Sequence, residues 1–365
     1  MRILHIVDSL DMGGIQTFLL NLNRAINTDE IQFDYMVFRD HDQVLEREFK
    51  ALGACVYKLP NWRKGIIKNR RALRQFFLEH DEYSIIHYHA GTLVDVGPLI
   101  EAKKAGIKHR IMHSHNTHAG GMYYNTIIHN INKRRICKLA TQYFACGKMA
   151  AQWMFRNTKA INNVRIVNNG IDAKKYAFNE TVRNKKRDEL NIGNQLALVH
   201  IGRFSEEKNQ AFLIKVMDII LKTNQDVQLY FLGDGVEKSK VEGLVKNHGL
   251  ENHIHFLGIR KDVAELLQAM DVFVLPSLFE GFPVVLVEAQ ASGLPCIVSD
   301  TVSKEVGINP NVHIIPLDNN ESEWASMILN SHERVIKQSN IVNSGFDLTD
   351  TAKKLEEFYK HLIMR

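Results

Sequence analysis

A chain of 365 residues with 45% hydrophobic residues can bury a large core in two domains, and its four scattered cysteines follow neither a metal-binding spacing nor a paired pattern, which favours a reducing compartment. The net charge of +5 is uneven, because residues 1–175 hold 26 Lys and Arg against 15 Asp and Glu, whereas the remainder holds 20 against 26. No zinc spacing or RNA-binding signature accompanies the basic half, so we expect no nucleic acid partner and favour an anionic membrane surface or a phosphate-linked acceptor.

The chain begins with a short apolar stretch, residues 2–7, that reads as a buried strand. It is too short for a signal peptide, and no later apolar run approaches the ~20 residues of a membrane span. We therefore expect a cytoplasmic protein, either free or peripheral on the inner face of the cytoplasmic membrane.

A glycine loop with Gly13 and Gly14 follows, and then an amphipathic helical pattern. This is not the G-x-G-x-x-G of a dinucleotide site, and two adjacent glycines alone also fit a tight turn. Further short strands alternate with helical stretches, which predicts a parallel α/β sheet. They are expected at residues 33–38, 54–58, 85–87, 110–114, 142–146 and 164–167.

Two basic segments lie in this first half, at residues 62–74 and 133–138, the first of them partly amphipathic. Each is compatible with an ordinary solvated helix face. Their occurrence together in one half of the chain favours binding to a membrane surface.

Histidines gather at the ends of two predicted strands, with His87 and His89 on one and His113, His115 and His118 on the next. Two or three of them are conceivable metal ligands. The spacing matches no familiar zinc site, however, and no acidic or thiol ligand lies among them, so we expect no metal.

The second half starts after the turn at residues 168–172 and a polar stretch, residues 179–187, that we interpret as a linker. A second series of strands and helices follows, with strands expected at residues 196–202, 228–232 and 254–257. Arg203 and Lys208 lie in the first loop of this series, beside a predicted helix N-terminus. Fixed positive charge together with backbone donors is what a diphosphate requires, although two surface cations in a loop are also commonplace.

The most informative stretch is residues 276–295, PSLFEGFPVVLVEAQASGLP. It follows an apolar run at residues 272–275 and precedes another at 296–298, so the pattern is strand, tight loop, helix, strand. We expect the helix to begin at Pro283 and to end at Ser292. This arrangement places the loop and the helix N-terminus at the carboxyl edge of a parallel sheet, where anions bind.

Two carboxylates belong to this unit, Glu280 before the helix and Glu288 within it. Because the helix is apolar nearly all round, Glu288 needs a compensating partner. Either it pairs with a neighbouring loop while Glu280 complements the helix dipole, or both face a ligand rich in hydroxyl groups.

The spacing of Glu280 and Glu288, with Gly281, Phe282 and Pro283 between them and ASGLP at residues 291–295, resembles the signature of the retaining glycosyltransferases of family 4. The similarity is greatest to the enzymes of bacterial capsule and exopolysaccharide assembly. It covers nearly the whole chain, because IMHSHN at residues 111–116, the glycine loop and the Arg203 loop also match.

The resemblance implies a role for each matching residue. Glu288 would hold the ribose of a nucleotide sugar, Glu280 would lie beside the sugar and its phosphate, and the amides of residues 281–283 would reach the phosphates. His115 would contact the donor sugar and face the acceptor. The remaining assignments are the diphosphate pair Arg203 and Lys208, the glycine loop Gly13 and Gly14 under the phosphates, and the base-binding segment Gly258, Ile259 and Arg260. Gln16 stands where a Glu is common in the family, so it is left out of the site.

The fold implied is GT-B, with two Rossmann-like α/β domains facing each other across a cleft. We expect an acceptor-binding domain at residues 1–175, a nucleotide-sugar domain at 176–345, and a C-terminal helix at 346–365 that packs on the first domain. The implied reaction moves a sugar, with retention, from a nucleotide diphosphate sugar, most simply a UDP-sugar, to a hydroxyl of a glycan or lipid-linked saccharide. No metal or other cofactor is implied. Two alternatives are a sugar-nucleotide epimerase on the same fold and a non-catalytic nucleotide-sugar-binding subunit.

Overall fold

The computed structural model describes residues 1–11, 13–116, 123–280, 282–318, 320–331, 333–336 and 338–364. It contains two compact units, one formed by residues 1–170 together with 347–365 and the other by residues 171–346. The first unit is therefore completed by the C-terminal end of the chain.

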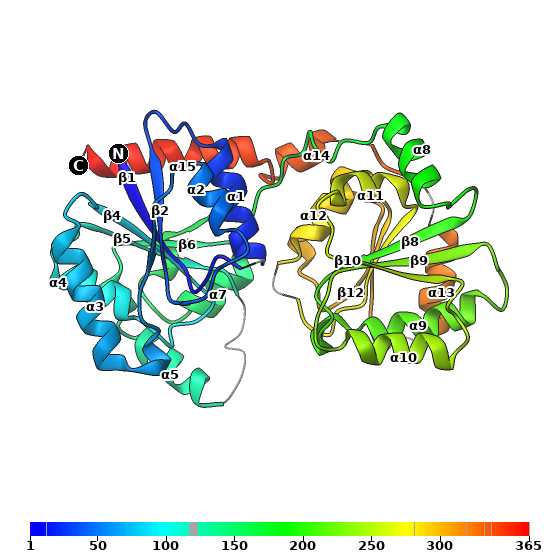
Figure 1. Ribbon diagram of the computed structural model, residues 1–365, viewed down its shortest axis with the longest axis horizontal. Helices are drawn as coiled ribbons and strands as arrows, with labels where there is room; N and C mark the ends of the chain where they lie inside the picture. Colours follow the sequence, from blue (N-terminus) through cyan, green and yellow to red (C-terminus); the bar gives the residue numbers. More distant parts are fainter. Residues whose placement is uncertain are drawn as a thin grey trace. The chain divides into compact units, whose positions relative to one another are not determined.

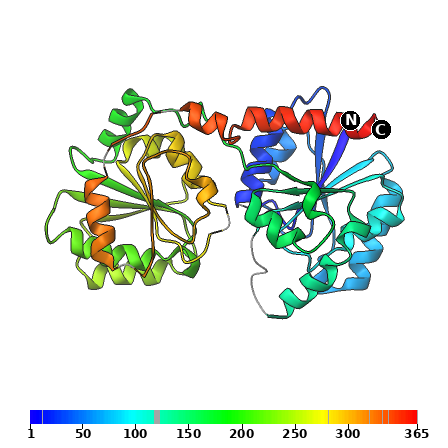
Figure 2. The ribbon, with the colours of Figure 1, turned by 180° about the vertical axis from the view of Figure 1, so that it is seen from behind.

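The first unit is built on a parallel sheet of seven strands in the order β3-β2-β1-β4-β5-β6-β7 (Figures 1 and 2). The strands are β1 (Arg2–Ile6), β2 (Gln32–Val37), β3 (Val56–Lys58), β4 (Ile85–Ala90), β5 (His109–Ser114), β6 (Gln142–Ala145) and β7 (Val164–Ile166). Strands β1, β2, β4 and β5 are almost entirely buried, as expected of a parallel sheet that is covered on both faces, whereas the edge strand β3 is not.

Helices cover both faces of this sheet, and each face has its own apolar core. One face packs against α1 (Gly14–Ala25), α2 (Glu46–Ala51) and α15 (Leu348–Ile363), the last of which also packs on α1. The other packs against α3 (Ile66–Glu79), α4 (Gly97–Lys104), α6 (Ile136–Leu139) and α7 (Lys148–Phe155). The remaining helix of this unit is α5 (Tyr123–Lys133), and short 3₁₀ turns occupy Trp62–Lys64 and Ile161–Asn163.

The second unit repeats the architecture with six parallel strands in the order β10-β9-β8-β11-β12-β13. The strands are β8 (Leu196–Ile201), β9 (Val227–Leu232), β10 (Ile254–Gly258), β11 (Val272–Leu275), β12 (Cys296–Ser299) and β13 (Val312–Ile315). One face is covered by α9 (Gln210–Ile220), α10 (Lys238–Asn247) and α13 (Glu321–Asn330). The other is covered by α11 (Val263–Ala269), α12 (Val284–Ala291) and α14 (Gln338–Asn343), while two further 3₁₀ turns lie at Glu206–Lys208 and Lys304–Val306.

The expected linker at residues 179–187 is wrong, because these residues form most of α8 (Glu180–Glu189). Asn179 caps this helix by accepting a hydrogen bond from the Val182 N–H. Arg183 and Arg187 then bind Asp271, which lies directly before β11, and so attach the polar helix to the body of the unit. A charged stretch with little apolar periodicity was therefore misread, because its stabilising partner lies far along the chain.

Two smaller differences concern the second unit. Strand β13 was not anticipated, and α12 begins at Val284 and ends at Ala291, so that Pro283 serves as its N-cap residue rather than its first helical residue. Differences of one residue at helix ends are common, and the strand, loop, helix, strand pattern of residues 272–299 is confirmed.

Strand order reverses once in each unit, between β1 and β4 in the first and between β8 and β11 in the second. At such a point the loops that follow the two neighbouring strands lead to opposite faces of the sheet and leave a crevice at its carboxyl edge, where open α/β folds bind their ligands. The loops after β1 and β4, and those after β8 and β11, are therefore the places to look for a site. Among the described helices, none combines the length and the apolar composition that crossing a bilayer demands.

Candidate active site

The reversal point of the second sheet brings Lys208 and Glu280 together. Lys208 ends the 3₁₀ turn after β8, Glu280 lies in the loop after β11, and the Lys208 Nζ is 2.6 Å from the Glu280 Oε2. Their side chains are only 20% and 10% exposed, so the ion pair is largely shielded from water. Two residues that the sequence assigned to one site from separate motifs are thus in direct contact.

Backbone and side-chain hydrogen bonds hold these two loops in register. The Leu278 N–H donates to the Glu207 carbonyl at 2.8 Å, and the Asn209 side-chain amide donates to the Pro276 carbonyl at 3.1 Å. Asn209 has a φ of 53°, in the left-handed region, where Asn is better tolerated than most residues. Asn209 can therefore adopt this conformation at the N-cap position of α9, at the sheet edge.

The loop after β9 is packed tightly beneath the Arg203 loop. A β-carbon at Gly233 would lie 2.1 Å from the Gly202 carbonyl oxygen, and one at Gly235 would lie 2.3 Å from the Phe204 carbonyl oxygen. Both glycines also have positive φ values. Only glycine fits at these two positions, so the backbone of the loop after β9 packs directly against the backbone of the loop after β8.

Arg203 extends from that supported loop with an exposed side chain and forms no ion pair within the described part of the chain. Its carbonyl accepts a hydrogen bond from the Gln210 side chain, which anchors the backbone at the start of α9. Because Lys208 is neutralised by Glu280, Arg203 is the uncompensated cation of this loop.

The segment assigned to the nucleobase lies at the neighbouring carboxyl end, after β10. The Gly258 carbonyl accepts a hydrogen bond from the Gly233 N–H at 2.8 Å, Ile259 is 65% exposed, and Arg260 pairs with Asp262 at 2.7 Å. The segment is therefore fixed at its base and open to solvent at Ile259, as a surface that receives a flat ring would be.

The loop before α12 presents a helix N-terminus to the same edge. Phe282 packs on Phe346 with ring centroids 5.5 Å apart, and Pro283 precedes the first turn of the helix. The first N–H groups of a helix have no partner within it, so they are available to an anion. Gly281 and His118 lie outside the described residues.

Glu288 lies in α12 and receives a hydrogen bond from the Tyr176 hydroxyl. Burial among apolar side chains raises the pKa of Glu288, although that hydrogen bond acts in the opposite direction. A carboxylate held in this way has unused acceptor capacity, which matches the two adjacent hydroxyls of a ribose.

In the first unit, the loop between β1 and α1 has the expected glycines at the sheet edge. Gly13 precedes α1 in an extended conformation, and above Gly14 no described heavy atom lies within 4 Å of where a β-carbon would be. A pocket of about 200 Å³ lies at the ends of β1, β2 and β4. Its polar lining includes Asp8, Gln16, Arg63, Thr92 and Asp95, and its aromatic lining includes Trp62 and Tyr88.

His115 follows β5 and is the outermost member of a buried histidine cluster. Its Nε2 lies 2.9 Å from the His89 Nδ1, and Phe18 of α1 packs near its ring. Burial lowers the pKa of His115 to about 3, so the imidazole is neutral at physiological pH. It can act there as a hydrogen-bonding group but not as a standing positive charge.

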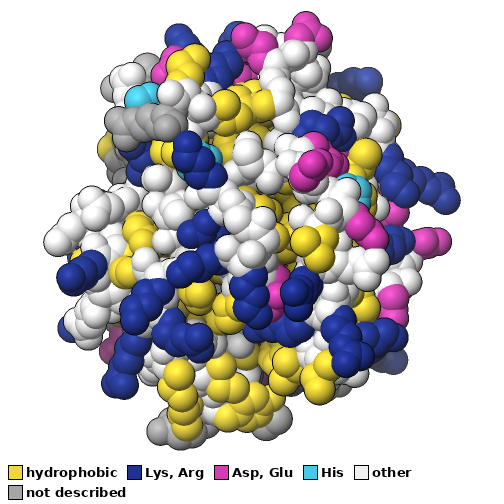
Figure 3. Space-filling model, turned by 90° about the vertical axis from the view of Figure 1, so that its left-hand side faces the viewer, with side chains coloured by type: hydrophobic (Ala, Val, Ile, Leu, Met, Phe, Trp, Pro, Cys, Tyr) yellow, Lys and Arg dark blue, Asp and Glu magenta, His cyan; other side chains and the backbone are white. Residues whose placement is uncertain are grey.

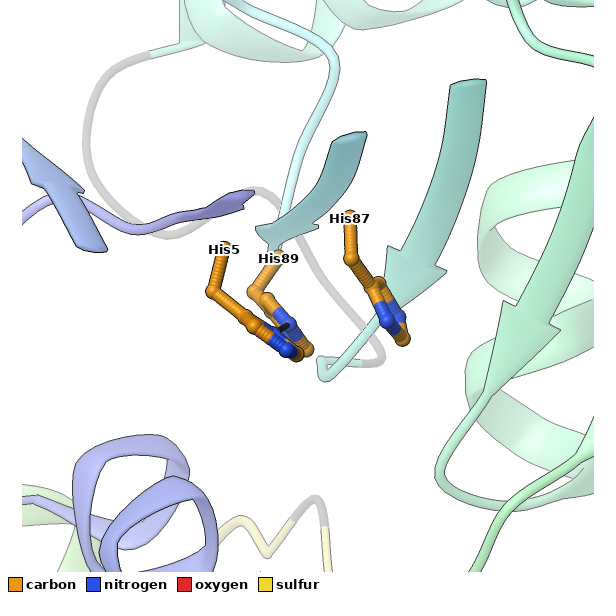
Figure 4. A group of neighbouring side chains, drawn as sticks. All are labelled: His5, His87 and His89. Atoms are coloured by element: carbon orange, nitrogen blue, oxygen red, sulfur yellow. Dashed lines mark hydrogen bonds between the residues drawn. The ribbon is translucent and has the colours of Figure 1, made fainter. Parts of the chain in front are cut away.

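Two groups in this cluster have the spacing of metal ligands, since one ring nitrogen from each of His5, His87 and His89 lies within 4.8 Å of the others, and the same is true of His89, His113 and His115. Figure 4 shows the first group, with His5 and His89 reaching toward one another from neighbouring strands. Several of these nitrogens are already engaged in histidine-histidine hydrogen bonds. Neither group includes a carboxylate or thiolate to compensate the charge of a dication, and we continue to expect no metal.

Sequence comparisons find a family match in each of the two units. Residues 12–175 match the family described as Glycosyltransferase Family 4, and residues 182–328 match the family described as Glycosyl transferases group 1. EpsF of Bacillus subtilis (strain 168), which is named as a glycosyltransferase, is 32% identical over 334 residues that cover 90% of this chain and 86% of EpsF. The chain belongs to glycosyltransferase family 4. The family resemblance drawn from the sequence is thereby confirmed.

The fold of this glycosyltransferase is GT-B. The crystal structure of Anabaena Alr3699/HepE in complex with UDP superposes with a TM-score of 0.82 at 19% identity, covering 99% of this chain and 100% of that one. A second relative, the UDP-Gal:alpha-D-GlcNAc-diphosphoundecaprenol alpha-1,3-galactosyltransferase of Escherichia coli, is 25% identical over 82% of this chain and 81% of its own.

Sequence reasoning missed the residues that support the site. Tyr176, which bonds Glu288, follows the turn between the two units and has no local pattern that marks it. His5 lies in the first strand, isolated in sequence from the other histidines, and only the pairing of β1 with β4 brings it to them. Strand register, which is not readable from one sequence, supplied this information.

Proposed function

We propose that this glycosyltransferase moves a sugar, with retention of configuration, from a UDP-sugar to a hydroxyl of a glycan or lipid-linked saccharide during capsular or exopolysaccharide biosynthesis. The observation that carries the donor half of the proposal is the Lys208–Glu280 pair at the reversal point of the second sheet. Around it lie an exposed arginine, two helix N-termini and the half-buried carboxylate of Glu288, a combination that suits a diphosphate, a sugar and a ribose together.

Charge development in the reaction explains the assignment of the two cations. When the glycosidic bond to the diphosphate breaks, negative charge grows on the departing phosphate oxygens. Arg203 and Lys208, with the N–H groups at the start of α12, are the donors that we assign to that charge. Because these groups supply the positive charge, we propose that turnover needs no metal ion and persists in the presence of a chelator.

The acceptor is assigned to the pocket of the first unit. Its aromatic side chain Trp62 offers a flat apolar surface for a sugar ring, and Asp8 and Asp95 offer acceptors for sugar hydroxyls. UDP as the nucleotide is supported by the UDP in the HepE crystal structure, and a lipid-linked acceptor by the diphosphoundecaprenol in the name of the Escherichia coli relative.

An acceptor on a lipid carrier requires the enzyme to work at a membrane surface, and the first unit has a surface that fits one. We define the α3 surface as Arg63, Lys64, Ile66, Ile67, Lys68, Arg71, Arg74 and Leu78, all of them exposed. Ile66, Ile67 and Leu78 are 60%, 70% and 69% exposed, which is unusual for such side chains, and five cations surround them. Figure 3 shows Lys and Arg side chains spread over this side of the first unit, interspersed with hydrophobic ones.

Apolar side chains among cations are suited to the interface of an anionic bilayer. The apolar side chains enter the boundary of the acyl chains, and the Lys and Arg side chains contact the anionic headgroups. A helix face that only faced water would gain nothing from exposed isoleucines. We therefore propose that the enzyme is peripheral on the cytoplasmic membrane through the α3 surface.

The decisive experiment combines donor binding with turnover. The purified protein is offered a panel of nucleotide sugars with and without a lipid-linked saccharide, and released nucleotide diphosphate and glycosylated product are both measured. For His115→Ala we expect UDP affinity within about twofold of the unchanged protein and transfer lowered on the order of 10²-fold, because a hydrogen-bonding group is lost from the transition state. A melting curve on the same preparation serves as the folding control.

The outcomes separate the proposed reaction from its alternatives. Conversion of the nucleotide sugar without an acceptor would identify an epimerase. UDP binding with no conversion of any donor would identify a non-catalytic subunit. Full transfer by His115→Ala would show that His115 is only a buried structural histidine.

A further inference from the structure

Five histidines on one face of the first sheet, four of them buried and His115 half-buried, form two hydrogen-bonded rows that run across its strands. The first histidine row consists of His5 in β1, His89 in β4 and His115 after β5. Its links are His5 Nδ1 to His89 Nε2 at 2.9 Å and His89 Nδ1 to His115 Nε2 at 2.9 Å. Each ring pair has its centroids 5.1 Å apart and planes within 35°, so the rings meet edge to edge.

The second histidine row lies directly against the first. It runs from the Tyr359 hydroxyl of α15 to His87 Nδ1 at 2.6 Å, and from His87 Nε2 to His113 Nδ1 at 3.1 Å. The rings of the two rows stack, with centroids 4.2 Å apart for His87 and His89. The second row has no hydrogen bond to His115, although it is equally buried, and this makes it a natural control.

A neutral imidazole has one N–H and one bare nitrogen, so every hydrogen bond along the first row must point the same way. Burial lowers the pKa of all three imidazoles, which keeps them neutral. The row thus has two possible directions. In one, His115 has its proton on Nδ1; in the other, His115 has its proton on Nε2 and His5 has its proton on Nε2.

The surroundings of the two row ends favour the first direction. The His5 Nε2 is fully buried and has no hydrogen-bond partner among the described residues, so a proton there would be an orphaned donor in the apolar interior. Such buried unpaired N–H groups are rare because they cost free energy. The His115 Nδ1 is likewise buried without a partner among the described residues, but His115 as a whole is half-buried and lies just after the carboxyl end of β5, where a ligand can supply one.

We propose that His89, itself oriented by His5, is a positioning residue that fixes His115 as the neutral Nδ1–H tautomer and thereby makes it a hydrogen-bond donor to the sugar nucleotide. This inference rests on the proposed function for its catalytic consequence, but the tautomer itself is independent of it. The row also fixes the orientation of the ring, since both the direction and the plane of His115 follow from its bond to His89.

The test compares three substitutions in the full-length chain. His89→Phe removes the link to His115, His89→Asn keeps a side-chain amide that can donate to the His115 Nε2, and His87→Phe makes the same change in the second row. Nitrogen-15 NMR of histidine-labelled protein reports the tautomer of His115, with His115→Ala used to assign its signals. Transfer is measured on the same samples as kcat and as KM for donor and acceptor.

We expect His115 to be the Nδ1–H tautomer in the unchanged chain, in His89→Asn and in His87→Phe, and to become a mixture in His89→Phe. We expect kcat to fall about tenfold in His89→Phe, and to stay within about threefold in His89→Asn and twofold in His87→Phe, with unchanged UDP affinity throughout.

An Nε2–H tautomer in the unchanged chain would overturn the inference, and so would an equal loss of kcat in His89→Phe and His87→Phe, which indicates packing alone. If the unchanged chain converts no donor at all, the proposed function fails, and the NMR comparison still decides whether the row sets the tautomer.

Discussion

Glu288 illustrates at the scale of one residue how a binding group is maintained at the expense of stability. Its carboxylate lies on an apolar helix, where burial raises its pKa and one tyrosine hydroxyl is its described hydrogen-bond donor. A raised pKa means that the folded protein disfavours the charged form relative to the unfolded chain. The carboxylate is retained, in our interpretation, because a ribose supplies the missing hydrogen bonds.

Replacing Glu288 by Gln should therefore have opposite effects on stability and on binding. UDP affinity should fall about 10- to 100-fold, because hydrogen bonds to a charged acceptor contribute about 1.5–3 kcal/mol. At neutral pH the free energy of unfolding should rise by roughly 0.5–2 kcal/mol. Calorimetry with UDP and denaturant unfolding measure the two quantities.

The sign of the pH dependence is fixed by the raised pKa. The folded-state pKa of Glu288 lies above that of the unfolded chain. The loss of unfolding free energy caused by the charged Glu288 is therefore absent below about pH 4, and it grows as the pH rises through the folded-state pKa. The stability advantage of Glu288→Gln should shrink accordingly in acid. The matched control is Glu242→Gln on the exposed side of α10, which should alter neither quantity. Unchanged UDP affinity in Glu288→Gln would refute the ribose assignment.

The site residues that could be predicted from the sequence alone are those that lie close together along the chain. Glu280, Phe282, Pro283 and Glu288 belong to one strand, loop and helix, so a short stretch of sequence places all four. The contact of Lys208 with Glu280 required the adjacency of β8 and β11, which the family resemblance implied and strand patterns alone did not. The histidine rows depend on the register between β1, β4 and β5, which no pattern in the sequence predicts.

At the scale of elements, α8 shows how a polar segment becomes part of a fold through one partly buried carboxylate, that of Asp271. Asp271 accepts hydrogen bonds from the Ala197 N–H at 2.8 Å and from Arg187 at 3.0 Å, and Arg183 pairs with its other oxygen at 2.5 Å. Arg183 also donates to three carbonyls at the end of α11. Helix α8 is thus fixed by charge and hydrogen bonding rather than by an apolar face, which is why hydrophobic periodicity did not reveal it.

Asp271→Asn should lower the free energy of unfolding of the second unit by about 3 kcal/mol at pH 7, because two arginines lose a partly buried counter-charge. Burial acts to raise the pKa of Asp271, but the Ala197 N–H and the two arginines outweigh it and the pKa is lowered. Its contribution is therefore present above the unfolded-state pKa near 4 and is lost as the pH falls through the lowered value.

The difference between Asp271→Asn and the unchanged protein should consequently narrow below about pH 4. Asp226→Asn, at an exposed position in the same unit, is the control and should change stability by less than about 0.5 kcal/mol. Denaturant unfolding followed by circular dichroism at several pH values measures both. A pH-independent loss would indicate that packing, not charge, accounts for the effect of Asp271.

At the scale of the whole chain, the uneven distribution of charge has a structural basis in the first unit. The excess of Lys and Arg is concentrated partly on α3 and the turn before it, where the solvent-facing positions Ile67, Arg71, Arg74 and Leu78 recur at helical spacing. Arg70, by contrast, turns inward toward Asp95 at 3.9 Å and is only 28% exposed. The cations available to a partner are therefore fewer than the sequence count suggests, and they surround exposed apolar side chains.

Binding of the full chain to vesicles tests whether this surface meets a membrane. Co-flotation compares vesicles of phosphatidylcholine alone with vesicles in which about a third of the lipid is anionic phosphatidylglycerol. We expect binding to the anionic vesicles only, and a steep loss of binding when salt rises from about 0.1 M to about 0.5 M, because exposed charges are screened over shorter distances.

Arg71→Glu with Arg74→Glu should weaken binding roughly 30-fold or more, since each basic residue near such a surface contributes about 1 kcal/mol. Ile66→Ser with Ile67→Ser should weaken it at constant charge, through loss of the apolar contact. The matched control is Lys246→Glu with Lys261→Glu, an equal change of charge at exposed positions of the second unit, which should leave binding within about threefold. If the α3 variants and this control lose binding equally, net charge alone attracts the protein to the vesicles. If none of the variants differs from the unchanged chain, the α3 surface does not dock on the membrane, and its exposed isoleucines must have another partner.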